Sequence, residues 1–384
     1  MQSLLRAAQV ITPDEEFSPG WVLLRDRSID AVGAGGGPER IPATDLGPVT
    51  LAPGFVDIHV HGGGGFPLMT TRAEDVSHYS RWVVSHGVTS FLATICAETV
   101  EAGRACAGLI SGLNPEAAAS AEILGVNFEG PFVSPARLGA LPATWATAPA
   151  VSAFTELLAA ARGKLRLITV APEPEGALEV IAAAVNNGVR VSIGHSDAGY
   201  EDAIKGFEAG ASHVTHAFNA MRPMHHRDPG IIGAALQSES VTIELIADGV
   251  HVHPATSRLL VRAFGPDRVA LVTDGATPAG LANGTFRIGR LEAHLSDGRI
   301  ALPDGTIAGS AATMDVLLRN VVKWGCASLG DAVRMLSTVP ASVAGAGDRK
   351  GRIAAGYDAD LVALTPELEV AAAWVRGELV FGAP

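Results

Sequence analysis

The sequence predicts an α/β protein built on a (β/α)8 barrel of the TIM type, with a small β-sandwich domain formed by both chain ends. Three observations favour this fold class. Short β-branched runs alternate with Ala-rich stretches of helical spacing, as in parallel strands joined by crossover helices. Eight such runs occur, which is the number that closes a barrel. Apolar residues make up 48% of the 384 residues and charged residues 18%, which favours a large buried core.

The barrel strands and some of the helices can be placed by these patterns. The expected strands are Phe55–Val60, Val88–Ile95, Ile123–Phe128, Leu165–Val170, Val189–Ile193, His213–Thr215, Thr242–Ala247 and Val269–Thr273. The expected helices include Ala73–His86, Glu98–Leu113, Glu175–Asn187 and Tyr200–Ala209. Periodicity alone leaves an open, doubly wound sheet as an alternative to the closed barrel.

The two ends of the chain have a different pattern from the middle. Short alternating runs lie at Gly20–Leu24 and Ser28–Val32, and similar runs lie at Asp360–Thr365 and Ala373–Phe381. Two β-rich ends can form one domain where the termini lie close together. We therefore expect a small β-sandwich from residues 1–52 and 346–384, and a catalytic barrel from residues 53–345.

Charge and cysteine usage limit the partners and the compartment. The formal net charge is −12 and the pI is near 5.4, so neither nucleic acid nor an anionic membrane is an expected partner. An anionic small substrate would need a local cationic site. Cys96, Cys106 and Cys326 form no CxxC pair, and the N-terminal segment lacks a signal-peptide core, so a reduced, cytoplasmic location is expected.

The most informative motif lies at the end of the first expected strand. His59 and His61 are separated by one residue and followed by Gly62. Side chains two residues apart on a strand share a face, so both imidazoles would point into the barrel at its C-terminal mouth. A single histidine in this place is usually structural, but two on one strand face favour a metal site.

Four further polar side chains repeat this placement. Glu129 ends the third expected strand, His195 the fifth, His216 the sixth and Asp274 the eighth. Imidazole nitrogens and carboxylates gathered at one rim are the ligands of a divalent transition metal. His213 lies three residues before His216 and would face the other way, so we expect it to support the site or serve the structure only.

These residues resemble the amidohydrolase superfamily, with HxH after the first strand, His after the fifth and sixth, and Asp after the eighth. Within it the chain resembles the N-acetylglucosamine-6-phosphate deacetylase family. The matching segments are Pro53–Gly65, Asn127–Pro131, Gly194–Asp197, His216–Met221, Ala247–His251, Thr273–Gly280, Gly309–Met314 and Gly351–Pro366. The resemblance thus covers nearly the whole chain, and the HAFNAM and ADGVH segments are more specific than HxH.

The resemblance implies a metal-dependent hydrolase that releases acetate from a phosphorylated amino sugar. His195, His216 and Glu129 would hold one divalent metal, and His59 and His61, with Glu129 bridging, would hold a second. Zinc or iron is expected, in one or two sites per subunit. Asp274 would take a proton from the attacking water and pass it to the departing amine.

The resemblance also implies how the substrate phosphate is bound. His251 and Arg227 match the family's phosphate ligands, with Arg227 reaching the neighbouring active site of a homodimer. Asn219 and the backbone of Ala220 match further sugar–phosphate contacts.

One position departs from the family pattern. Leu141 stands where the family has a histidine that polarises the substrate carbonyl, and losing one such donor can cost on the order of 100-fold in rate. Three alternatives follow: another amidohydrolase acting on a different N-acyl amino sugar or a cyclic amide, a catalytically impaired family member, or a non-catalytic binding protein.

Overall fold

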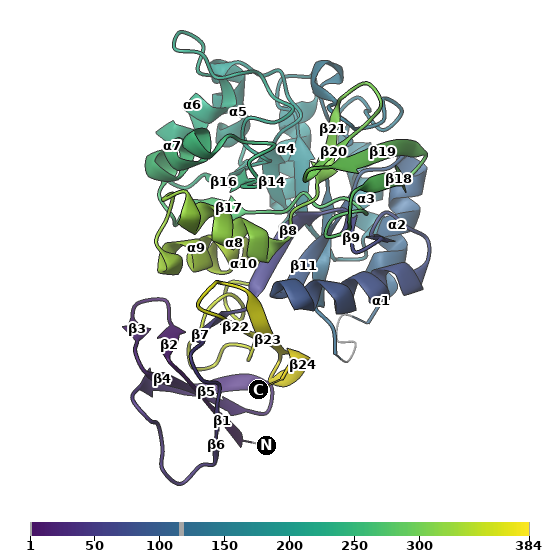
Figure 1. The fold of residues 1–384 in the computed structure, drawn as a ribbon. Coiled ribbons are helices and arrows are strands. Elements are labelled where there is room, and N and C mark those ends of the chain that lie inside the picture. Colours follow the sequence, from purple (N-terminus) through teal and green to yellow (C-terminus); the bar gives the residue numbers. More distant parts are fainter. Residues whose placement is uncertain (1, 115–118, 384) are drawn as a thin grey trace.

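The structure is a computed structural model that describes residues 2–114 and 119–383. It confirms the eight parallel strands, and each of them pairs with the next one along the chain (Figure 1). The strands are β8 (Phe55–Val60), β11 (Val88–Ile95), β12 (Glu122–Phe128), β13 (Leu165–Val170), β14 (Arg190–Ile193), β15 (His213–Val214), β16 (Thr242–Leu245) and β17 (Val269–Leu271).

Backbone hydrogen bonds between the first and last strands close the sheet. The N–H of Asp274 donates to the carbonyl of His59 at 2.8 Å, and the N–H of His61 donates to the carbonyl of Gly275 at 2.8 Å. Val60 and Gly275 form a parallel bridge at the same place. The segment after β17 therefore completes the barrel, and the alternative of an open sheet is wrong.

Helices cover the outside of the barrel, and those expected from the sequence occur within about two residues of their expected bounds. The segment expected as one helix over 73–86 divides into α1 and a 3-10 turn, η1. In α4 the buried residues Ala177, Val180, Ile181 and Ala184 recur at helical spacing and pack against the barrel. The helices are α1 (Ala73–Trp82), η1 (Val83–His86), α2 (Val100–Gly112), α3 (Val151–Ala160), α4 (Ala177–Asn186), α5 (Tyr200–Glu208), α6 (Gly230–Gln237), α7 (Pro254–Phe264), α8 (Met314–Lys323), α9 (Leu329–Leu336) and α10 (Thr338–Val343).

Three barrel strands, β15, β16 and β17, end one or two residues earlier than the sequence pattern predicts, whereas β14 ends at Ile193 as expected. The chain enters positive φ at His195 (φ 46°), His216 (φ 25°) and Asp274 (φ 48°). Residues in this region cannot continue a strand, so the backbone turns just where these three side chains leave the sheet. Non-glycine residues held in this conformation cluster at functional sites.

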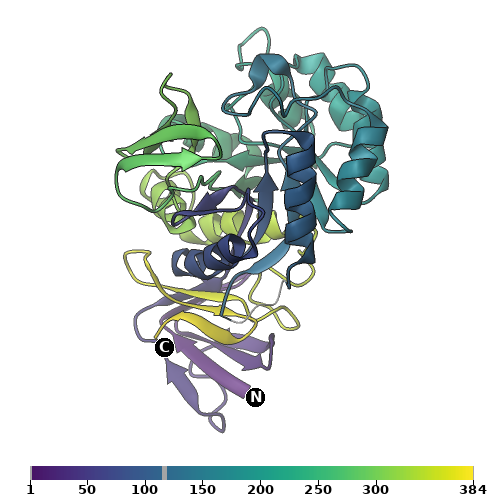
Figure 2. The same ribbon diagram turned by 90° about the vertical axis from the view of Figure 1, so that its right-hand side faces the viewer.

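Both chain ends contribute to one small β region beside the barrel (Figure 2). One sheet has the order β5-β4-β1-β6, and the other has β24-β23-β22-β7-β2-β3. Leu5, Val22, Leu361 and Trp374 belong to the apolar cluster between them. The strands are β1 (Gln2–Ala7), β2 (Gln9–Ile11), β3 (Glu16–Phe17), β4 (Gly20–Arg25), β5 (Ser28–Ala34), β6 (Ala43–Asp45), β7 (Thr50–Pro53), β22 (Leu361–Leu364), β23 (Val370–Val375) and β24 (Glu378–Gly382).

The tail differs from its expected pattern in one respect. The run expected at Ala373–Phe381 is two antiparallel strands, β23 and β24, because Arg376 (φ 50°) and Gly377 (φ 78°) make a tight turn within it. The division of the chain into domains at residues 52/53 and 345/346 stays a proposal.

An antiparallel sheet inserted after β17 was not predicted from the sequence. Its strands are β18 (Gly284–Ile288), β19 (Leu291–Ser296), β20 (Arg299–Ala301) and β21 (Ile307–Ser310). It has its own apolar cluster, which includes Ala293, Leu295 and Ile300 and against which Ala140 packs from the loop after β12. A short hairpin of β9 (Gly62–Gly63) and β10 (Phe66–Pro67) follows the first barrel strand.

Among the described helices, none is long and apolar enough to cross a membrane.

Candidate metal centre and substrate cavity

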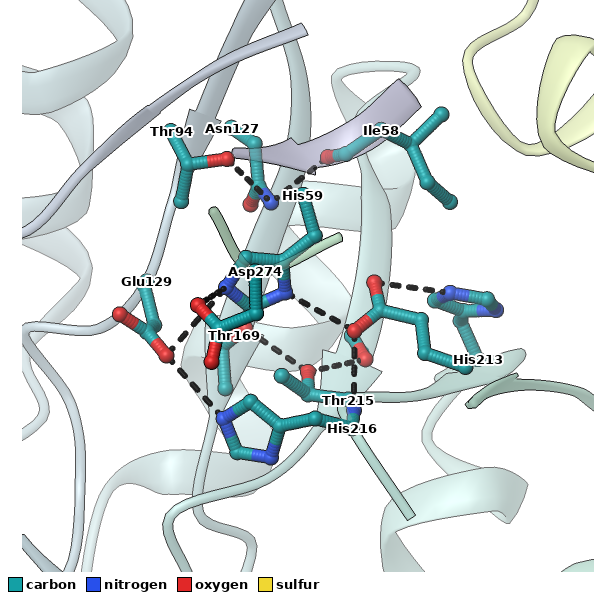
Figure 3. Close-up of polar contacts among 12 residues, drawn as sticks. Ile58, His59, Thr94, Asn127, Glu129, Thr169, His213, Thr215, His216 and Asp274 are labelled. Atoms are coloured by element: carbon teal, nitrogen blue, oxygen red, sulfur yellow. Dashed lines mark hydrogen bonds and ion pairs between the residues drawn. The ribbon is translucent and has the colours of Figure 1, made fainter. Parts of the chain in front are cut away.

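The five expected metal ligands converge at the C-terminal mouth of the barrel, around the carboxylate of Glu129. Figure 3 shows three of them, His59, Glu129 and His216, together with Asp274. Oε1 of Glu129 lies 2.9 Å from Nε2 of His195, 3.1 Å from Nε2 of His216 and 3.4 Å from Nε2 of His59. Its Oε2 lies 3.3 Å from Nε2 of His61. Four histidines from three separate stretches of the chain thus present the same ring nitrogen to one carboxylate.

Asp274 lies at the same cluster, on the side of the HxH pair. Its Oδ1 is 3.2 Å from Nε2 of His61 and 3.6 Å from Nε2 of His59. The carboxylate lines a cavity and is partly exposed to it. Asp274 is therefore placed to exchange a proton with a molecule bound beside the histidines.

Hydrogen bonds at Nδ1 fix the orientation of two of these rings. Nδ1 of His59 lies 2.9 Å from Oε2 of Glu244, and Nδ1 of His195 lies 2.9 Å from the carbonyl of Arg137. Both partners are acceptors, so each Nδ1 must donate. In a neutral ring Nε2 then has a lone pair, which faces the carboxylate of Glu129. A lone pair facing a carboxylate is unfavourable unless a proton or a metal ion lies between the two groups, and an Nδ1 that donates to a carboxylate or carbonyl is typical of metal-binding histidines.

The electrostatics of the cluster also call for positive charge. Burial opposes protonation of His59, but the facing carboxylates of Glu244 and Glu129 raise its pKa well above the usual range. Burial raises the pKa of Glu129, whereas His195 and His216 lower it, and the net value is well below normal. The buried negative charge of these carboxylates therefore needs a nearby positive charge, which a divalent cation would supply.

The residues present fit a metal ion. Nε2 of His59 is buried and has no hydrogen-bond partner, and Nε2 of His195 and His216 lie only 3.0 Å apart. Ligand atoms bound at 2.0–2.1 Å in a tetrahedral site are separated by roughly 3.3 Å, close to the spacings around Glu129. The groups able to hold an ion include His59–Glu129–His216 and His59–His61–Asp274.

Glu244 belongs to this site, although sequence reasoning did not select it. It is fully buried on β16, where it accepts the hydrogen bond from His59 and also one from the N–H of His216 at 2.9 Å. Its Oε1 lies 3.3 Å from Nε2 of His213, and this ring lies on the side of the site away from Glu129 (Figure 3). A lone glutamate in the apolar stretch Thr242–Ala247 was the feature that could have identified it.

Cys96 is a second neighbour that was not selected. Its Sγ lies 3.7 Å from Nδ1 of His61, and it is placed by the end of β11. Cys96, His61 and Glu129 form a further group whose ligand atoms lie close enough to share an ion.

A cavity of about 370 Å³ opens over the cluster. Among the described residues that line it there is no lysine or arginine, so His251 is its one potential cation outside the metal cluster. The expected substrate residues Asn219 and Ala220 line it, and so does Leu141. Arg227 lies elsewhere in this chain, where its Nη1 is 2.9 Å from Nε2 of His226 on an exposed loop.

His251 is held by the buried carboxylate of Asp248. Nδ1 of His251 donates to Oδ2 of Asp248 at 2.7 Å, and the hydroxyl of Ser310 donates to the same oxygen at 2.8 Å. Burial lowers the pKa of His251, but the bond to Asp248 outweighs it and the net pKa is raised. The backbone N–H of Ser310 also donates to the carbonyl of Asp274 at 2.8 Å, which joins this pair to the metal cluster.

A closed (β/α)8 barrel with histidines and carboxylates at this rim defines the metal-dependent hydrolases of the amidohydrolase type, and residues 50–380 match the amidohydrolase family. The chain therefore belongs to the amidohydrolase family, and within it to the N-acetylglucosamine-6-phosphate deacetylases. It is 35% identical to the enzyme of that name from Bacillus subtilis (strain 168), with 98% of this chain and 97% of that protein covered.

Two further relatives agree with this assignment. The crystal structure of N-acetyl-D-glucosamine-6-phosphate deacetylase from Mycobacterium smegmatis superimposes with a TM-score of 0.93 at 35% identity, covering 99% of this chain and 100% of that one. The N-acetylgalactosamine-6-phosphate deacetylase of Escherichia coli O157:H7 is 32% identical, covering 99% of both chains. The family expected from the sequence is confirmed, and a non-catalytic binding protein is not favoured.

Proposed function

We propose that the protein hydrolyses the acetamide of N-acetyl-D-glucosamine 6-phosphate to glucosamine 6-phosphate and acetate. The observation that carries the proposal is the convergence of four imidazoles on Glu129 beside Asp274, in a cavity that also holds His251. The names of the relatives from Bacillus subtilis and Mycobacterium smegmatis support the choice of substrate.

In this proposal the side chains around Glu129 hold one or two divalent metals, with zinc or iron as the ion. His195, His216 and Glu129 would hold one metal, and His59 and His61 would hold a second together with Glu129. When bound, such a metal supplies a Lewis acid that polarises the amide carbonyl and makes water more acidic. Glu244 and the carbonyl of Arg137 keep the two rings they contact turned toward the ion.

Asp274 moves the proton in this mechanism. Its carboxylate accepts a proton from the attacking water as the oxygen–carbon bond forms. It then donates this proton to the amide nitrogen, because an amine leaves only when protonated. Leu141 offers no hydrogen bond to the carbonyl, so no side chain at that position assists the polarisation.

The substrate phosphate is bound at the other end of the cavity. His251, kept charged by Asp248, faces it, and Asn219 and the backbone of Ala220 contact the sugar phosphate. A single imidazolium only partly balances a phosphate, so we propose that Arg227 of a second copy completes the site in a homodimer. The substrate is a cytoplasmic sugar phosphate in this proposal, which agrees with the reduced cysteines.

Acetate release tests the function directly. Metal-loaded protein is expected to release acetate from N-acetylglucosamine 6-phosphate but not from unphosphorylated N-acetylglucosamine. Equal turnover of the two sugars would contradict the phosphate role of His251 and Arg227. N-acetylgalactosamine 6-phosphate belongs in the same assay, because it is the substrate in the name of the Escherichia coli relative. Faster turnover of this sugar than of N-acetylglucosamine 6-phosphate would make it the proposed substrate instead.

A further inference from the structure

The cavity has two chemically different sides. Asn219 and His251, which follow β15 and β16, form its polar side. The opposite side is largely apolar, with Glu98 and Thr306 among its polar residues, and consists of residues after β8, β11 and β12 together with the inserted sheet. This apolar wall is formed by Met69, Ala97, Ala140, Leu141, Ile288 and Ile307.

The order of the strands places Ala97, Ala140 and Leu141, which follow β11 and β12, across the barrel mouth from Asn219 and His251. The inserted sheet follows β17, which is next to β16 in the barrel. In the closed sequence of eight strands, β11 and β12 are second and third, whereas β15 and β16 are sixth and seventh. Positions four strands apart in an eight-stranded barrel lie on opposite sides of its axis. A ligand that reaches His251 and continues past the metal cluster therefore points toward the apolar wall.

The proposed function, on which this inference rests, fixes how the substrate lies along that line. Its phosphate lies at His251, and its amide carbon lies within reach of Asp274 and the histidines. The acyl chain extends from this carbon, away from the sugar. Leu141 lines the same cavity as Asp274 and His195, and a Cβ placed on Gly139, two residues earlier, would lie 3.7 Å from Cε1 of His195 and 3.5 Å from Cβ of Ala220.

The apolar wall is packed against two apolar clusters. Ala140 and Ile288 pack against the cluster of the inserted sheet, whereas Ala97 and Leu141 belong to the core of the barrel. Leu141 is 8% exposed and presents only carbon to the cavity. An acetyl group has a single methyl to place against it, whereas each further methylene buried there would improve affinity by about fourfold.

We propose that the apolar wall is an acyl-binding surface, and that the protein hydrolyses N-acyl glucosamine 6-phosphates with chains longer than acetyl, such as propionyl and butyryl. The reaction is the same for each chain length. Water forms a bond to the acyl carbon, the carbon–nitrogen bond breaks, and Asp274 transfers the proton to nitrogen. The products are glucosamine 6-phosphate and the corresponding carboxylate.

Binding and turnover of an acyl series test the proposal separately. Calorimetry on metal-loaded Asp274→Asn measures the affinity for N-acetyl, N-propionyl and N-butyryl glucosamine 6-phosphate without hydrolysis. In the same background, Leu141→Phe fills part of the cavity beside the apolar wall, and Leu141→Asn makes the wall polar. Leu259→Asn is the matched control, because Leu259 is 63% exposed on α7. Metal content and melting temperature establish that each variant is folded.

The expected result is equal or tighter binding as the chain lengthens, and a kcat/KM for propionyl within about tenfold of acetyl in the unmutated enzyme. Leu141→Phe should weaken butyryl binding by at least about tenfold relative to acetyl, and Leu141→Asn by about fourfold. The Leu259 control should leave all three affinities unchanged.

Two results would overturn the proposal. One is a loss of more than about tenfold in affinity from acetyl to propionyl, as in a pocket closed around a methyl group. The other is an equal effect of Leu141→Phe on all three ligands. A protein that binds the series as expected yet hydrolyses none of it would support the acyl-binding surface and contradict the proposed function.

Discussion

His59 and Glu244 form a fully buried pair inside the barrel, with Nδ1 of the ring 2.9 Å from Oε2 of the carboxylate. They come from β8 and β16, which are separated by β17 in the sheet. Glu244 also accepts from the backbone N–H of His216, so one carboxylate orients residues on both sides of the cluster. The orientation of His59 and of the backbone at His216 therefore depends on a carboxylate outside the groups of described residues that could hold an ion.

Glu244→Gln should weaken metal binding by about 10–100-fold, because an amide orients His59 less firmly and removes its negative charge. Competition with a chromogenic chelator measures this affinity. Glu292→Gln is the control, since Glu292 is exposed on β19. An unchanged metal affinity in Glu244→Gln would show that the pair does not position His59.

Asp274→Asn should keep its metal and lose at least about 100-fold in kcat, because the amide cannot accept the proton of water. Elemental analysis and acetate release on the same preparation check both parts. A variant that keeps more than about a tenth of the kcat would exclude Asp274 as the proton carrier.

Asp248→Asn should raise KM for the phosphorylated sugar by about tenfold with little change in kcat, since Asp248 holds and charges His251. The bond to Asp248 raises the pKa of His251, so phosphate binding is strong at low pH and weakens as pH rises through that pKa. In the variant this loss should occur at lower pH. Asp267→Asn, at a site with 78% side-chain exposure, is the control; an unchanged KM and pH profile in Asp248→Asn would remove Asp248 from phosphate binding.

A buried ionic cluster joins the chain end to the barrel. Nζ of Lys350 lies 2.6 Å from Asp360, 2.8 Å from Glu122 and 2.9 Å from Asp358. Lys350→Met removes the cation beside Asp360, while Arg349 still pairs with Glu122 and Asp358. The substitution should lower the free energy of unfolding by about 3 kcal/mol, measured by urea denaturation. Lys205→Met, at an exposed pair, should change it by less than about 0.5 kcal/mol.

The same cluster predicts a pH dependence. Burial raises the pKa of Glu122, but Arg349 and Lys350 outweigh it and lower the value to about 2, from 4.5 in the unfolded chain. Its contribution to stability is therefore complete above about pH 4.5 and is lost as pH falls toward 2. A loss of stability in this range that is the same in Glu122→Gln would contradict this assignment.

The barrel could be predicted because its strands are short apolar runs bounded by polar residues. Some of their ends were less predictable, since β15 and β17 stop short of His216 and Asp274, which adopt positive φ. That conformation is imposed by the tertiary contacts of the rim and leaves no local pattern. The six residues of the expected cluster could be selected because each lies at or just beyond the C-terminal end of a barrel strand, with His59 still inside β8.

Other parts of the site could not be predicted in this way. Glu244 lies within a strand, and its role appears only when β8 and β16 are brought together. The strands β18–β21 are short and largely exposed, and only the alternation of Ala293 and Leu295 on β19 indicates them. Arg227 lies outside the cavity of its own chain, so its role depends on a second copy.

Metal removal and return is the most direct test of the central claim, that the ions held around Glu129 and Asp274 drive amide hydrolysis. Protein stripped by a chelator is expected to release no acetate from N-acetylglucosamine 6-phosphate, and to regain activity in proportion to the zinc or iron bound. His195→Ala, treated identically, should bind less metal and regain little. Full acetate release by metal-free protein, or none by protein with its metal sites filled, would contradict the claim.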